Sequence, residues 1–123
     1  MRALVLGTIA ALLATGAASA KKPEIPVGTP DGEAVSCIPL NQIRNTRVRS
    51  DKVIDFYMTG NRVYRNELPY ECSSLGFEER FLYKTSLSQL CSTDTITVLH
   101  TPPAVQGPTC GLGKFQPIKL EKR

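Results

Sequence analysis

The chain has 123 residues, with 15 lysine and arginine residues against 11 aspartate and glutamate residues, and a formal charge of +4 at pH 7. This length accommodates one domain. No run of five or six like charges occurs, which argues against a nucleic-acid-binding arm and against a polybasic membrane anchor. The sequence contains no cofactor fingerprint and no complete catalytic motif. We therefore expect no nucleic-acid partner and no cofactor, and the sequence favours a protein that is not an enzyme.

Residues 1–20 have the pattern of a secretory signal peptide. Met1-Arg2 provides a short positive start, an apolar run follows from Ala3 to Ala18, and Ala18-Ser19-Ala20 offers the small residues that a signal peptidase accepts. A membrane-spanning helix needs about 20 apolar residues, and this run is shorter and ends in a cleavage site. We expect a cleaved leader, a periplasmic or secreted mature protein, and no membrane span after cleavage.

Residues 21–34 contain three prolines and two glycines and show no apolar periodicity. This composition is typical of a flexible segment. We interpret residues 21–34 as a flexible N-terminal arm. Residues 35–120 are expected to form a disulfide-containing β domain.

A β-hairpin is predicted in the middle of this domain. Apolar side chains alternate along residues 53–59, which is the period of a half-buried strand. Gly60-Asn61 is typical of a two-residue hairpin turn. This turn would place Met58 opposite Val63 and Tyr57 opposite Tyr64. Phe56 would then face Arg65, a mismatch that predicts a bulge or a sheet edge.

Other short segments also favour strands. They are rich in threonine, valine, isoleucine and aromatic residues, as strands prefer: residues 35–38, 80–86, 95–100 and 113–120. The stretch Gln106-Gly107-Pro108 is interpreted as a loop, and residues 40–45 are compatible with a helical turn or a loop. The predicted fold class is all-β: a small single-domain barrel or compact sandwich of five to six short antiparallel strands, stapled by two disulfides.

Four cysteines, an even number in an exported chain, predict those two disulfides. They are Cys37, Cys72, Cys91 and Cys110. No CxxC motif is present, so a redox dithiol and a zinc site are both disfavoured, and we expect no metal. Four cysteines allow three connectivities, among which the sequence cannot decide. We favour the nested pairing, with Cys72–Cys91 inside Cys37–Cys110.

Catalytic residues are hard to find. A serine hydrolase could be assembled from Asp94, His100 and one of the serines, but no GxSxG motif is present. Asp94 lies in the turn-like Ser92-Thr93-Asp94 and is expected to bond its own backbone. A small periplasmic hydrolase with a site around Asp94 and His100 is therefore the alternative function and not the preferred one.

A cluster of arginines and tyrosines is the better candidate for a functional surface. Arginine side chains can hold anions and tyrosine rings can add contact area. The candidate binding face consists of Arg47, Arg49, Arg62, Arg65, Tyr57 and Tyr64. Its partner would be an envelope protein, a glycan or a small anion. In the alternative interpretation the cluster is a solvated surface, on which Asp51, Asp55 and Glu67 pair with the arginines.

Several motifs give the chain a family resemblance that spans about residues 35–118. The motifs are Cys37-Ile38, Ile54-Asp55-Phe56, residues 61–68 (NRVYRNEL), Cys72-Ser73-Ser74-Leu75, residues 90–96 (LCSTDTI) and residues 110–115 (CGLGKF). With them the chain resembles a family of small exported bacterial domains of unknown function. The resemblance implies a signal-bearing, disulfide-containing periplasmic or secreted domain, and it implies no activity. Together these features favour a non-catalytic binding or interaction module of the cell envelope.

Overall fold

The computed structural model describes residues 25–85, 87–100 and 105–120. Within these ranges it contains ten short strands and one four-residue helix, α1 (Leu75–Glu78), with 3-10 turns at Leu40–Gln42 and Thr59–Asn61. The strands are β1 (Gly28–Pro30), β2 (Cys37–Pro39), β3 (Ile43–Val48), β4 (Val53–Met58), β5 (Arg62–Glu67), β6 (Phe81–Tyr83), β7 (Gln89–Cys91), β8 (Thr95–His100), β9 (Val105–Gly111) and β10 (Phe115–Leu120). The predicted signal peptide, residues 1–20, lies outside the described residues.

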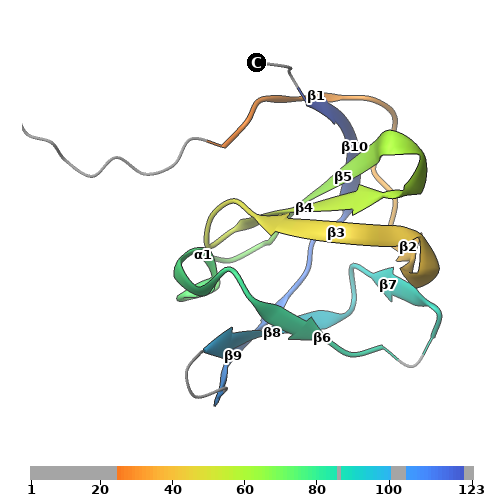
Figure 1. Ribbon diagram of the computed structural model, residues 1–123. Helices are drawn as coiled ribbons and strands as arrows, with labels where there is room; N and C mark the ends of the chain where they lie inside the picture. Colours follow the sequence, from red (N-terminus) through yellow and green to blue (C-terminus); the bar gives the residue numbers. More distant parts are fainter. Residues whose placement is uncertain (1–24, 86, 101–104, 121–123) are drawn as a thin grey trace, which may run out of the picture.

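The strands form three antiparallel sheets. The largest has the order β1-β10-β5-β4-β3, a second has the order β6-β8-β9, and β2 pairs with β7. Figure 1 shows the five-stranded sheet above the three-stranded one, with β2 and β7 at one side. The predicted all-β fold is confirmed. There are more strands than the five to six expected, and the sheets of the described part do not close into a barrel.

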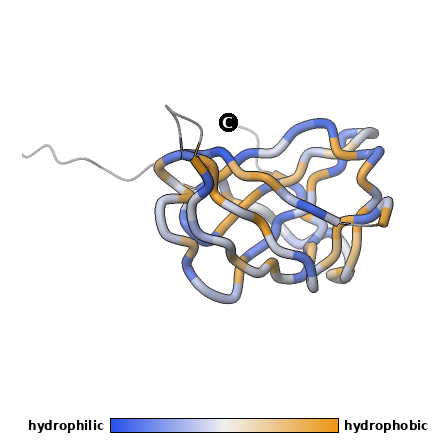
Figure 2. Tube along the Cα trace, turned by 90° about the horizontal axis from the view of Figure 1, so that it is seen from below, coloured by the Kyte–Doolittle hydropathy of each residue, from blue (hydrophilic) through white to orange (hydrophobic). Residues whose placement is uncertain are grey.

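The hydrophobic core lies between the sheets. The predicted alternation of β4 is confirmed, since Ile54 and Phe56 are fully buried and Met58 is 2% exposed. The Phe56 ring packs edge-on against Phe115 of β10, with 5.4 Å between ring centroids, and against Phe81 of β6 at 6.4 Å. Figure 2 shows apolar stretches of chain crossing the interior. One aromatic side chain from β4 therefore joins both layers.

The hairpin of β4 and β5 forms as predicted, but its register differs by one residue. Its loop has three residues, Thr59–Asn61, and both Gly60 and Asn61 adopt positive φ angles, of 77° and 60°. These are conformations that glycine and asparagine adopt most readily. Phe56 consequently faces Tyr64 and not Arg65. The predicted mismatch and bulge disappear from this strand pair.

Part of the expected flexible arm belongs to the largest sheet. Within residues 21–34, β1 pairs with β10, placing Thr29 opposite Lys119. The expectation of a flexible arm therefore does not hold for Gly28–Pro30. A strand of three residues with a proline at its end carries little sequence signal, because its pairing depends on β10, which is far away in the chain.

Both disulfides predicted from the cysteine count are present, but the favoured nested pairing is wrong. The bonds join Cys37 to Cys91 and Cys72 to Cys110. Cys37 and Cys91 are direct partners in the register of β2 and β7. Sheet pairing between distant segments, not loop length, thus decides which sulfurs meet. The two disulfides suggest an oxidising, extracytoplasmic environment.

A buried asparagine ties β5 to the segment before β10. The Asn66 side chain is fully buried and donates to the Gly113 carbonyl at 2.7 Å, while the Gly113 N–H donates back at 2.8 Å. A Cβ atom at Gly113 would overlap the Glu67 carbonyl oxygen. Glycine is therefore required here by the close approach of two backbones.

Candidate functional site

The outer face of the largest sheet carries a row of charged side chains across three strands. Cross-strand partners share one face of a sheet. Asp55, in the middle of β4, is the partner of Arg47 on β3 and of Arg65 on β5. Strand alternation would leave Asp55 facing solvent, yet it is fully buried. Charged side chains must therefore cover and neutralise it.

Two arginines hold the Asp55 carboxylate. Arg65 donates from Nε to Oδ1 at 2.8 Å and from Nη2 to Oδ2 at 2.9 Å, while Arg49 donates from Nε to Oδ2 at 3.0 Å. The hydrogen bond with Asp55 raises the pKa of the Arg65 guanidinium above its ordinary value, against the lowering effect of burial. Arg65 also donates to the Pro26 carbonyl at 2.9 Å, which holds the residues before β1 against this face.

Tyr57 extends the network along β4. Arg49 donates from Nη2 to the Tyr57 hydroxyl oxygen at 2.8 Å, and the Arg47 guanidinium lies 6.0 Å from the centre of the Tyr57 ring. This is the range of a cation–π contact. We call Arg47, Arg49, Asp55, Tyr57 and Arg65 the arginine face. Three arginines against one aspartate leave it with a formal charge of +2.

A groove of about 670 Å³ adjoins the arginine face at the end of β3. Its basic lining residues are Arg47, Arg49 and Lys52, its acidic ones are Asp51, Glu71 and Glu79, and Ile25 also lines it. Asp51 is already engaged, because its Oδ1 accepts the Gly76 N–H at 2.6 Å. The basic residues come from β3 and the β3–β4 connection, which also contributes Asp51, whereas Glu71 and Glu79 come from the segment around α1.

The other two members of the predicted face, Arg62 and Tyr64, lie elsewhere. Tyr64 is the cross-strand partner of Phe56, whose side chain points into the core. The one-residue change of register moves Tyr64 to that side, because a slip by one residue exchanges the two faces of a strand. Arg62 lies two residues before Tyr64 and therefore on the same side of β5. It donates to the Gln42 side chain at 2.6 Å. The predicted cluster is thus divided between two sides of the sheet.

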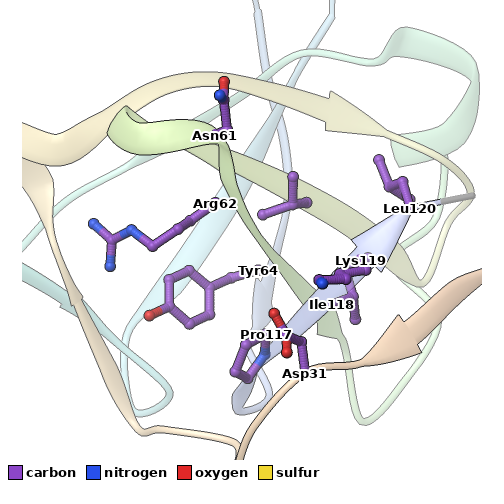
Figure 3. Close-up of a pocket in the computed structure, with 9 residues that line it drawn as sticks. Asp31, Asn61, Arg62, Tyr64, Pro117, Ile118, Lys119 and Leu120 are labelled. Carbon is purple, nitrogen blue, oxygen red and sulfur yellow. The ribbon is translucent and has the colours of Figure 1, made fainter. Parts of the chain in front are cut away.

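Arg62 and Tyr64 line a second, smaller pocket of about 470 Å³ together with residues of β10. Figure 3 shows both side chains on one side of β5, with Pro117 and Asp31 beside the tyrosine ring. Lys119 of β10 also lines this pocket. Within the described residues no carboxylate lies within 4.0 Å of Arg62 or Lys119.

The structure does not bring Asp94 and His100 together. Asp94 accepts the Cys91 N–H through Oδ2 at 2.8 Å, as expected for a turn residue. His100 Nδ1 lies 2.8 Å from Glu78 Oε2 on α1. The two residues lie at opposite ends of β8, about 20 Å apart at the usual rise of an extended strand. The geometry of a shared catalytic site around them is absent.

In the part of the chain that the structure describes, no group of three or more His, Cys, Asp or Glu side chains is placed to hold a metal ion. The same residues include no helix that is both long and apolar enough to cross a membrane.

Comparisons with protein families, with curated proteins and with solved structures find no match for this chain. The resemblance to a family of small exported domains therefore stays a prediction.

The sequence did not indicate that Asp55 holds two arginines in place. From the sequence, this residue was expected only to neutralise arginines on a solvated surface.

Proposed function

We propose that this protein is a binding module of the cell envelope, periplasmic or secreted, whose arginine face binds an anionic group of a partner. The observation that carries the proposal is the excess of positive charge on this face. One buried carboxylate orients two arginines, and a third arginine, Arg47, lies beside them. Arg47 has no carboxylate within 4.0 Å among the described residues.

The arginine face is suited to binding because its donors are already in place. Guanidinium groups match carboxylates and phosphates with paired N–H groups. Asp55 fixes the Arg49 and Arg65 side chains. Ligand binding therefore costs less side-chain conformational entropy. The Tyr57 hydroxyl accepts from Arg49, which leaves its own proton free to be donated to a ligand oxygen.

Two features support a location outside the cytoplasm. The four cysteines form two disulfides, which persist in oxidising compartments. Residues 1–20 have the pattern of a signal peptide. Both agree with a module that meets its partner in the periplasm or outside the cell.

The test compares two arginines with equal charge and different location. Polyglutamate serves as the anionic probe, and calorimetry at low ionic strength measures its affinity for the oxidised protein. Arg47→Gln should weaken binding about tenfold, the equivalent of about 1.4 kcal/mol for a charged hydrogen bond. Arg62→Gln removes the same charge on the other side of the sheet and should change the affinity less than about threefold. Equal losses in the two variants would show that only net charge matters and would refute the proposal.

A further inference from the structure

The strand β3 leaves one edge of the largest sheet open. Among the residues that the structure describes, it is the last strand of that sheet and pairs with β4 alone. The Arg49 N–H donates to the Val53 carbonyl at 2.8 Å. This hydrogen bond establishes which residues of β3 direct their backbone groups toward β4. In an antiparallel pair, residues two apart point their N–H and C=O groups in the same direction. Asn45 and Arg47 therefore bond to β4, whereas Thr46 and Val48 direct their backbone groups away from the sheet.

This edge has few of the features with which proteins block unwanted pairing. β3 spans six residues and contains no proline, in contrast to β1 at the opposite edge. It has a bulge only at its start, between Ile43 and Asn45. Its exposed side chains are Arg44, Asn45 and Arg47. The edge thus offers unpaired backbone groups flanked by positive charge.

The charge of β3 decides which occupant fits. A second copy of this chain would bring its own Arg44 and Arg47 against those of the first, and like charges on neighbouring strands destabilise the pair. An acidic strand would instead place its carboxylates beside the arginine face. We propose that β3 accepts an extended acidic segment of a partner protein as an additional strand of the sheet. This inference rests on the proposed function and names the kind of partner involved.

The two faces of the sheet specify the side-chain pattern of that segment. Arg47 lies on the outer face, while the neighbouring Val48 packs against the hydrophobic core. A strand added beside β3 continues both faces, so acidic residues should alternate with apolar ones.

The probe is a blocked eight-residue peptide in which glutamate and valine alternate. Two N-methylated forms are compared with it, one methylated at every valine and the other at every glutamate. Only alternate N–H groups of an added strand face β3, so one form should lose binding at least tenfold and the other should bind within about threefold of the parent peptide. Equal affinities for the two forms, or no binding of the parent peptide, would overturn the inference.

A protein variant provides a second test of the same strand addition. Thr46→Pro removes one outward N–H and leaves the bonds to β4 intact, as proline at an edge position does. Thr46→Pro should weaken binding of the parent peptide at least tenfold, whereas Thr46→Val should not weaken it. Circular dichroism checks that the proline variant is folded; if it is not, the N-methylated pair alone decides.

The outcomes separate this inference from the proposed function. If Arg47→Gln weakens polyglutamate binding but the two N-methylated peptides bind equally, the arginine face binds anions and strand addition is wrong. If Arg47→Gln and Arg62→Gln behave alike while one N-methylated form loses binding, strand addition is supported and the specific role of the arginine face is refuted.

Discussion

Replacing Asp55 with asparagine keeps the shape of the side chain and removes its charge. Three charge-assisted hydrogen bonds from Arg49 and Arg65 then lose their ionised acceptor. Removing one partner of a buried ion pair costs about 3–5 kcal/mol. The two arginine side chains are still 16% and 18% exposed, so solvent screens part of the uncompensated charge. We expect a loss near the lower limit, about 3 kcal/mol.

Such a loss is large for a small domain, whose net stability is about 5–15 kcal/mol. It corresponds to a decrease in melting temperature of about 12–24 °C. Urea unfolding of the oxidised protein measures it, with Glu67→Gln as the control, because Glu67 is an exposed acid on the neighbouring strand. The control should change stability by less than about 0.5 kcal/mol. A loss below about 1 kcal/mol for Asp55→Asn would show that the carboxylate does not organise the arginine face.

Two further predictions concern backbone approach and pH. Gly113→Ala should destabilise the protein by about 2–4 kcal/mol, because the added methyl group meets the Glu67 carbonyl oxygen. The control is Gly111→Ala, which should be nearly neutral because a Cβ atom there has open space around it. Thermal unfolding compares the two variants. Equal melting temperatures would contradict the close approach. The pKa of the Arg65 guanidinium is raised in the folded state. Its contribution to the stability of the fold is therefore complete below the pKa that Arg65 has in the unfolded chain, and it is lost only when pH rises through the still higher pKa of the folded state. The stability difference between wild type and Asp55→Asn should therefore be the same at about pH 8 and about pH 10, and a marked decrease at the higher pH would refute this assignment.

The all-β class could be predicted because local patterns carry it. The alternation along β4 and the Gly60-Asn61 pair are properties of neighbouring residues, and both are features of the real hairpin. The predicted contact of Phe56 with Arg65 was a warning that the register was wrong. A shift by one residue replaces it with Phe56 opposite Tyr64 and places Asp55 opposite Arg65. The opposite charges of Asp55 and Arg65 favour the observed register over the predicted one, whereas an aromatic pair occurs in both.

Elements whose pairing is distant in the chain could not be predicted in this way. Residues 43–48 are mostly polar and become β3 because β4 offers a complementary edge. Gln106-Gly107-Pro108 has the composition of a loop but lies in β9, an edge strand that tolerates proline. The disulfide pairing failed for the same reason, since it follows from the meeting of β2 and β7.

The grouping of side chains in the candidate site was predicted only in part. Arginines and tyrosines were expected to share a face, and Arg47, Arg49, Tyr57 and Arg65 do. The burial of Asp55 was not foreseen, because strand alternation assigns this residue to solvent. Asp55 is held by the long side chains of Arg49 and Arg65, and Arg65 in turn donates to the Pro26 carbonyl; neither contact leaves a local pattern in the sequence.

The pairing of the cysteines tests the fold most directly, because every conclusion about the arginine face depends on how the sheets meet. Trypsin alone leaves two cysteines on one peptide, but trypsin together with endoproteinase Asp-N separates all four. The cysteine-containing peptides are then residues 31–44, 66–80, 85–93 and 94–114. Mass spectrometry of the unreduced digest should find 31–44 bonded to 85–93 and 66–80 bonded to 94–114. Peptide 66–80 bonded to 85–93, or alkylation of any cysteine without prior reduction, would contradict the structure.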